Sequence, residues 1–358
     1  MQIYSDKLHH KLQILASRKK ATQLGGVNFS SALLLAPMAS ICNSPFRLLM
    51  QELGSGGSVS ELISCHGINY ANDKTLNMLY IDPREENVGI QLFGEDADAL
   101  SASIEKVLEY GPSFIDINMG CPVKKVVTKG GGSALLKDTK KLSTFLKVIK
   151  KNTPIPLTIK IRTGWDDEST NADEVIKVAT DSGVEFVAIH GRTRAQGYSG
   201  VADWDYLEKL SSVAELPIIG NGDLHTPGKV RARMEVSSTD ALMIARGCLR
   251  NPFIFLESLA EAEDELHFGA CDYLEVLDRF YQLVCERFES EKVRLIQMRK
   301  MIVWFSAGFK GAGRFREGVF KGAGLSEIMD LSHQFFMMNE TFEKNIDYSK
   351  SFMSSGHG

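Results

Sequence analysis

A cysteine at position 121 stands where a side chain could take part in chemistry. Residues 115–118 are typical of a buried strand, and Gly120, Cys121 and Pro122 follow them directly. Three lysines and three consecutive glycines come next, at 124, 125, 129 and 130–132. A thiol with an ordinary pKa is mostly protonated at neutral pH, so Cys121 could act as a proton donor. A cysteine on its own is more often a small buried side chain.

Four side chains that can carry positive charge lie near the ends of other apolar segments. They are Lys160, Arg162, His190 and Arg246. Each alone has a plainer explanation, such as a surface lysine or a hydrogen-bonded structural histidine. Burying an ammonium group without a partner costs several kcal/mol, so cations that converge on one site indicate a bound anion.

Two glycine-containing turns narrow the nature of that anion. Asn221, Gly222 and Asp223 follow one apolar segment, and Ala245, Arg246 and Gly247 end another. Glycine lets a backbone approach a phosphate closely, and barrel folds often bind phosphate at such turns. The turns therefore predict a phosphorylated ligand, and flavin mononucleotide (FMN) and a sugar phosphate both fit.

These residues require a scaffold that brings the ends of several strands together. Eight short apolar segments have the character of strands, at 33–36, 58–62, 88–93, 114–118, 157–162, 186–190, 217–220 and 241–245. Helical patterns separate many of them, among them 97–110, 139–151, 172–182 and 226–235. The alternation predicts an α/β fold, a (β/α)8 TIM barrel, whose strand ends carry the chemistry. A doubly wound open sheet is the alternative, but no GxGxxG motif follows the first strand.

The alternation stops near residue 251, and the rest of the chain has helical periodicity. We therefore predict an N-terminal extension over 1–22, a TIM-barrel catalytic domain over 23–252 and a smaller all-helical domain over 253–350. Residues 351–358 are expected to form a flexible tail.

Composition excludes several classes of protein. The net charge of −4 gives the 358-residue chain no general attraction to nucleic acid. Its six cysteines form no CxxC pair and show no zinc spacing, so we expect reduced thiols and no metal. There is no apolar run long enough to span a membrane and no apolar stretch of a secretory signal near the start, where a mildly amphipathic helix is expected. We expect a cytoplasmic protein.

The sequence resembles the tRNA-dihydrouridine synthases, and most of all their bacterial B-type members. The resemblance rests on short motifs in a fixed order: APM at 36–38, SPFR at 44–47, SEL at 60–62, IQLFG at 90–94, DINMGCP at 116–122, KV at 125–126, GSALL at 132–136, KIRTGWD at 160–166, HGRTR at 190–194, NGD at 221–223, LMIAR at 242–246 and RKMIVWF at 299–305. Two features depart from the family pattern. Ala245 stands where the family often has glycine, and residues 1–22 precede the usual start.

The resemblance implies an FMN-dependent enzyme that reduces the C5–C6 double bond of uridines in tRNA, with NADPH as the electron donor. Hydride would pass from flavin N5 to uracil C6, and Cys121 would give a proton to C5. The implied cofactor-binding residues are Ala36, Pro37, Met38, Gln91, Lys160, His190, Asn221, Gly222, Asp223, Ala245 and Arg246. The implied substrate-binding residues are Asn118, Arg162 and His190.

A basic segment late in the chain suits a tRNA partner. Residues 292–321 carry eight lysines and arginines against one acid, Glu317. We expect six of these cations to contact tRNA phosphates: Lys292, Arg294, Arg299, Lys300, Arg314 and Arg316. A solvated helix face is the plainer explanation, and the aromatic residues among them are expected in the core. We expect a monomer.

Three other functions remain open at this point. The first is a flavin barrel enzyme that acts on a small molecule such as dihydroorotate or an enone. The second is a sugar-phosphate-binding barrel without redox chemistry. The third is a tRNA-binding chaperone that has lost catalysis, which the presence of Cys121 and Lys160 disfavours.

Overall fold

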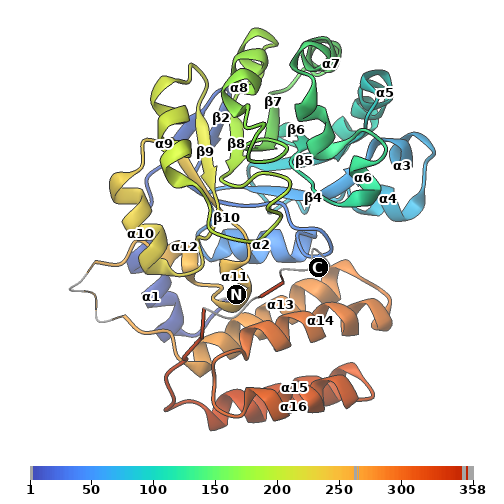
Figure 1. Ribbon diagram of the computed structural model, residues 1–358. Helices are drawn as coiled ribbons and strands as arrows, with labels where there is room; N and C mark the ends of the chain where they lie inside the picture. The colour runs from blue at the N-terminus through green and yellow to red at the C-terminus, as the bar shows by residue number, and fades with distance from the viewer. Residues whose placement is uncertain (1–2, 262–263, 265, 349–351, 354–358) are drawn as a thin grey trace.

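The computed structural model describes residues 3–261, 264, 266–348 and 352–353 (Figure 1). Eight parallel strands close into a barrel in the order β10-β3-β4-β5-β6-β7-β8-β9. They are β3 (Leu33–Leu35), β4 (Ser58–Ser64), β5 (Val88–Phe93), β6 (Phe114–Met119), β7 (Leu157–Arg162), β8 (Val187–His190), β9 (Ile218–Asn221) and β10 (Ala241–Ile244). The closed barrel confirms the predicted TIM-barrel fold, and the open-sheet alternative is wrong.

Helices surround the barrel, and a side chain caps the first turn of several of them. The helices and turns of this part are α2 (Ser44–Glu52), α3 (Cys65–Asn69), α4 (Asp73–Asn77), α5 (Ala97–Leu108), α6 (Lys124–Val127), the 3₁₀ helix η1 (Gly132–Lys137), α7 (Thr139–Lys151), α8 (Ala172–Asp181), α9 (Trp204–Val213), α10 (Pro227–Val236), α11 (Gly247–Arg250) and α12 (Ile254–Glu257). Asp96 and Asp138 cap α5 and α7 by accepting a backbone N–H of the first turn, which helps fix where these helices begin. The four helices predicted from periodicity are all present.

A short hairpin closes the amino-terminal end of the barrel. Its strands are β1 (Thr22–Leu24) and β2 (Val27–Phe29), which pair antiparallel. The ring of Phe29 makes edge contacts with Phe114 and Phe186, with centroids 6.0 Å away in each case. This apolar plug excludes water from one end of the barrel and leaves the carboxyl ends of the strands for a site.

Four helices form a separate layer beneath the barrel in Figure 1. They are α13 (Ala270–Arg287), α14 (Glu291–Phe305), α15 (Ala312–Lys321) and α16 (Leu325–Met338), and they confirm the predicted C-terminal helical region. Helix α13 packs on α2, and Arg279 of α13 forms an ion pair with Glu52 at 2.6 Å. None of the helices among the described residues is both long and apolar enough to cross a membrane.

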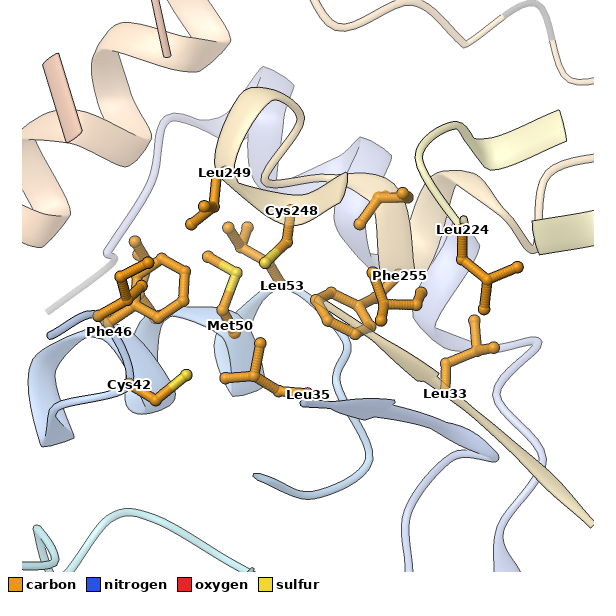
Figure 2. Close-up of a cluster of buried hydrophobic side chains, with 14 of the residues drawn as sticks. Leu33, Leu35, Cys42, Phe46, Met50, Leu53, Leu224, Cys248, Leu249 and Phe255 are labelled. Carbon is orange, nitrogen blue, oxygen red and sulfur yellow. The ribbon is translucent and has the colours of Figure 1, made fainter. Parts of the chain in front are cut away.

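An apolar cluster packs several helices against one strand of the barrel. Figure 2 shows side chains of β3, α2, α11 and α12 meeting in it, including Leu35, Met50, Leu249 and Phe255. Cys42 and Cys248 lie in the same cluster, completely buried, and all six cysteines of the chain are free. Two of the thiols are therefore packing groups, as the sequence analysis expected for most of them.

The N-terminal helix α1 (Asp6–Ala16) links the two parts of the molecule. Leu8, Leu12 and Leu15 are buried, and the helix packs on α12. Lys11 reaches α13, where its Nζ lies 2.7 Å from Oδ2 of Asp272. Ser5 donates to Glu275 of the same helix at 2.7 Å. The extension, which had no assigned role from sequence, thus braces the helical region against the barrel.

The packing of α1 predicts that a substitution in this helix, far from the barrel strands, lowers the stability of the fold. Leu8→Ala removes a fully buried side chain and leaves a cavity, so the free energy of unfolding should fall by about 2–5 kcal/mol. His10→Ala, at an exposed position of the same helix, should change it by about 0.5 kcal/mol or less. Urea titration of both variants measures the difference. Equal effects of the two changes would contradict the packing of α1.

Candidate active site

A cavity of about 1280 Å³, which includes its part open to solvent, lies at the carboxyl ends of the barrel strands. Each cofactor, substrate and catalytic residue predicted from sequence lines it: Ala36, Pro37, Met38, Gln91, Asn118, Cys121, Lys160, Arg162, His190, Asn221, Gly222, Asp223, Ala245 and Arg246. Strand register explains the convergence. Asn118 of β6 is in register with Lys160 of β7. Likewise, Arg162 of β7 is in register with His190 of β8, and His190 with Asn221 of β9. Residues at the same level of neighbouring parallel strands meet at one rim.

The backbone on both sides of Cys121 is held in place. Oδ1 of Asn118 accepts the N–H of Cys121 at 2.9 Å and that of Gly120 at 3.3 Å. The carbonyl of Cys121 accepts both the backbone N–H and the hydroxyl of Ser133, at 3.2 and 3.1 Å. Gly132 has a φ of +58°, and a Cβ there would lie 2.9 Å from the carbonyl oxygen of Cys121. Glycine is therefore needed at 132 so that η1 can approach the thiol-bearing loop.

A chain of buried hydrogen bonds inside the barrel fixes the amide of Asn118. Nδ2 of Asn118 donates to Oε1 of Gln91 at 2.9 Å, and Nε2 of Gln91 donates to Oδ2 of Asp116 at 2.7 Å. The hydroxyl of Thr158 donates to the other oxygen of Asp116 at 2.7 Å. Burial raises the pKa of the Asp116 carboxyl to about 6, against the effect of these hydrogen bonds and of Lys160. The chain orients Gln91 and Asn118 and so the loop that carries Cys121.

Two cations stand on β7, next to the thiol loop: Arg162 is buried and Lys160 is partly buried. Nζ of Lys160 donates to Oδ1 of Asn221 at 3.2 Å. Burial lowers the pKa of Lys160 to about 8; Arg162 contributes in the same direction and Asp116 opposes it. The guanidinium of Arg162 donates to the backbone carbonyls of three loop residues, Gly120, Thr193 and Gly197, at 2.8–2.9 Å. Arg162 thus clamps the loops that follow β6 and β8 as well as facing the cavity.

Asp223 is already engaged by protein donors. Nη2 of Arg192 lies 2.9 Å from both of its oxygens, and the N–H of Ala202 donates to one of them at 2.7 Å. Although burial opposes it, hydrogen bonds from His225, Ala202 and Arg192 hold the pKa of Asp223 well below its usual range. This carboxylate ties the loop after β8 to the loop after β9.

The turns after β9 and β10 form the far end of the cavity. Asn221 donates to the carbonyl of Met243 at 2.7 Å, which links the two strands. Gly222 has a φ of +140°, and a Cβ there would lie 2.5 Å from Cβ of Ala202, so only glycine fits. Arg246 donates to the carbonyl of Phe352 at 2.9 Å. The end of the cavity thus offers cationic and backbone groups, together with the closely packed Gly222.

Several cavity residues were not predicted from sequence. The most instructive is Tyr198, whose ring lies 4.8 Å from the guanidinium carbon of Arg246 and 5.7 Å from that of Arg162. An aromatic residue eight positions after His190, in the same loop, was the only available signal.

Met353 also lines the cavity, from the far end of the chain. Of the predicted tail, only Phe352 and Met353 lie within the described residues.

The six predicted tRNA-contacting cations fall into two groups. Lys292, Arg314 and Arg316 are exposed. Arg294, Arg299 and Lys300 are partly buried and donate to the backbone carbonyls of Phe288, Cys285, Gly322 and Ser40. The structure does not bring these cations into the cavity. Among the aromatic residues nearby, Phe305 and Phe309 are buried, and Phe315 stacks on Phe335 at 4.0 Å, in agreement with core packing.

The charge balance of the cavity shows which ligands fit. Lys160, Arg162 and Arg246 line it, whereas its one carboxylate, Asp223, is paired with Arg192. An anionic ligand fits this excess of donors and positive charge. Among the described residues, no three His, Cys, Asp or Glu side chains are grouped to hold a metal ion.

Comparison with known proteins places this site in a wider context. The family model described as "Dihydrouridine synthase (Dus)" matches residues 34–341. The chain is 34% identical over 296 residues to tRNA-dihydrouridine synthase B of Pseudomonas aeruginosa, covering 82% of this chain and 89% of that protein. It is 35% identical over 308 residues to the protein of the same name from Pseudomonas syringae pv. tomato, covering 83% and 88%.

A solved structure with low sequence identity shares the fold. The 6-hydroxypseudooxynicotine amine oxidase of Pseudomonas geniculata superimposes with a TM-score of 0.54 at 13% identity. The match covers 75% of this chain and 53% of the oxidase. Identity this low supports a common barrel fold alone.

The buried carboxyl of Asp116 gives a pH-dependent prediction. Its pKa is about 6 in the folded chain and about 3.9 when unfolded, so the native state binds the proton more tightly. Between about pH 4 and 6 the free energy of unfolding should therefore fall as pH rises, by about 3 kcal/mol from this group. Asp116→Asn cannot titrate, so the wild-type value minus the variant value should decrease over that range. Denaturant titrations across pH measure this difference, and a constant difference would contradict the buried state of Asp116.

Proposed function

We propose how this chain, which belongs to the dihydrouridine synthase family, performs its reaction on tRNA. The chain is a flavin oxidoreductase that synthesises dihydrouridine in tRNA. In detail, we propose that it reduces the C5–C6 double bond of specific uridines, with FMN as cofactor and NADPH as electron donor. The observation that carries it is that Cys121 and Lys160 line one cavity.

FMN fits the chemistry of the cavity wall. The residues proposed to contact its ring are Ala36, Pro37, Met38, Gln91, Lys160 and His190, and those proposed for its ribityl phosphate are Asn221, Gly222, Asp223, Ala245 and Arg246. When bound and reduced by NADPH, FMN supplies the hydride that C6 of uracil accepts. Asp223 would contribute mainly through Arg192 and the loop geometry, because Arg192 already contacts both of its oxygens.

Lys160 gives the ring end of the site a fixed positive charge. Its pKa of about 8 leaves the ammonium group mostly charged at neutral pH. Its one protein hydrogen bond among the described residues is to Asn221. Such a cation favours the more negative, reduced state of the cofactor and tunes its potential.

Asn118, Arg162 and His190 are proposed to hold the uracil ring. The amide of Asn118 uses Oδ1 for the backbone of Gly120 and Cys121, and one N–H for Gln91, which leaves a second N–H for the base. Arg162 adds positive charge near the carbonyl oxygen where negative charge develops during reduction. These contacts orient the base, and its C5 then needs a proton.

Cys121 is proposed to give that proton to C5 from the side of the base opposite the cofactor. Burial raises the pKa of the thiol, against the smaller opposing effects of a backbone hydrogen bond and Arg162. The sulfur therefore keeps its proton at neutral pH and is available as an acid. The ordered backbone described above holds the thiol at a fixed position.

Cys121→Ala tests this assignment. Dihydrouridine formation in single-turnover reactions should fall by about 10²–10⁴-fold, because the proton donor is lost. FMN content and NADPH oxidation should stay close to wild type. Cys271→Ala, a thiol on α13 remote from the cavity, serves as the matched control and should retain product formation. Normal dihydrouridine yield from Cys121→Ala would refute the acid role, and reduction of free uracil would favour a small-molecule enzyme.

Residues 253–350 are proposed to form the tRNA-binding domain, acting with a monomeric catalytic barrel in the cytoplasm. The exposed cations Lys292, Arg314 and Arg316 are its best candidates for phosphate contacts. Reaching a uridine inside folded tRNA requires extruding the base, at a cost of a few kcal/mol. Contacts to the tRNA backbone would offset part of that cost.

Salt dependence of tRNA binding tests this surface. Wild-type affinity should fall steeply with added salt, because binding releases counterions from phosphates. Changing Lys292, Arg314 and Arg316 to alanine should reduce the log–log slope by about one for each phosphate that the variant no longer neutralises. A control with the same charge change replaces Lys140, Lys147 and Lys177, which are exposed on α7 and α8 of the barrel. The proposal fails if the two triple variants have the same slope.

A further inference from the structure

The imidazole of His190 has a hydrogen-bond partner that determines where its proton lies. Nε2 of His190 is 3.3 Å from Nη1 of Arg192. A guanidinium group can only donate hydrogen bonds, so Nε2 must be the acceptor in this contact. An acceptor nitrogen carries no proton, and the proton of the neutral ring therefore lies on Nδ1.

The guanidinium of Arg192 is itself fixed from several sides. Its Nη2 contacts both oxygens of Asp223 at 2.9 Å and the carbonyl of Gly200 at 2.8 Å. Its Nε donates to the carbonyl of Ser199 at 3.0 Å. The side chain is almost completely buried, with 3% of its surface exposed. Arg192 therefore cannot turn away from His190 without breaking its ion pair with Asp223.

The opposite ring orientation fits this environment less well. Turning the ring by half a rotation would exchange Nε2 with the carbon Cε1 and leave the Nη1 donor of Arg192 facing a C–H group. The Cδ2 edge of the ring lies close to Gly222, where a built Cβ would be 3.4 Å away. The contact with Arg192 therefore selects the orientation as well as the proton position.

The charged groups around His190 also favour a neutral ring. Lys160 and Arg162 reach it from β7, and Arg192 from its own loop, whereas Asp223 is the one carboxylate that acts on it. Tyr198 is a further titratable neighbour, and its ring centroid lies 6.4 Å from that of His190. Burial lowers the pKa of His190 well below its ordinary value, and the three cations act in the same direction.

We propose that Arg192, anchored by Asp223, is a positioning residue that holds His190 neutral with its proton on Nδ1. The ring lines the cavity, and Nδ1 makes no hydrogen bond to any residue in the described part of the chain. On the proposed function, His190 presents one N–H donor to a carbonyl oxygen of the bound uracil or flavin. A neutral imidazole N–H is a poor acid, so His190 does not supply the proton to C5.

The protonation state of the ring can be measured without turnover. The full chain is labelled with ¹⁵N-histidine, and ring ¹⁵N–¹H correlation spectra are recorded with and without FMN between about pH 6 and 8. His190→Gln identifies the His190 signals among the eight histidines. We expect a protonated Nδ1 and an unprotonated Nε2 throughout. An imidazolium, or a proton on Nε2, at neutral pH would overturn the proposal.

A variant pair tests whether Arg192 is the cause. Arg192→Gln should shift both ring nitrogens toward a mixture of tautomers, because the obligatory donor is removed. Arg194→Gln changes a neighbouring arginine that lies over the ring of Trp165, whereas the His190 ring bonds to Arg192 in the described part of the chain, so the wild-type pattern should persist. A wild-type pattern in Arg192→Gln, or the same shift in both variants, would refute the role of Arg192.

The test of the His190 proton position is independent of the test of the proposed function. If Arg192→Gln fails to fold, the wild-type spectra still decide the proton position, and Asp223→Asn tests the anchor of Arg192 with the same readout. These spectra use neither tRNA nor NADPH. Absence of dihydrouridine formation would therefore contradict the proposed function and leave the tautomer result intact.

Discussion

The main constraint on this molecule is the burial of positive charge at the carboxyl ends of the barrel strands. Arg162 and Arg192 are withdrawn from water and Lys160 is partly buried, and an unpaired charge in such a place is costly. The chain offsets part of the cost with backbone carbonyls and with Asp223, and an anionic ligand would offset more. Because these cations need carbonyl or carboxylate partners, the loops around the cavity are positioned to supply them. For the same reason the cavity favours an anionic ligand.

Arginines in the sequence motifs do much of the structural work around the site. Arg162 joins the loops after β6 and β8 through three carbonyls, and Arg192 joins those after β8 and β9. Arg47 forms an almost completely buried pair with Glu85, with Nε 2.7 Å from Oε2, and also donates to the carbonyls of Cys42 and Tyr80. The planar guanidinium suits this role because it donates in several fixed directions at once. Residues shared with a family of enzymes can thus be required for loop geometry as much as for contact with substrate.

The sequence was informative where local pattern and register determine the structure. Continuous apolar runs such as 33–36 and 241–245 predicted barrel strands, because strands of a parallel barrel are buried on both faces. Polar residues at the ends of those strands could be predicted to meet, because register places them on one rim. Tyr198 and Met353 were missed because they reach the cavity through a loop and a terminal segment whose paths depend on tertiary packing. Charge counting also failed to separate the exposed Arg314 from Arg299, whose guanidinium donates to the carbonyl of Gly322.

The same buried, positive environment gives the candidate acid and its neighbours different protonation states. Burial raises the pKa of a thiol and lowers that of an imidazole, because it disfavours the charged form of each. Cys121 therefore keeps its proton, and His190 stays neutral, with one nitrogen that accepts from Arg192 and one that can donate. Burial also disfavours the charged form of Lys160. The ordinary pKa of a lysine is much higher than that of a histidine, so Lys160 remains mostly charged at neutral pH. One cavity can thus be lined by a neutral thiol, a neutral imidazole and a cation.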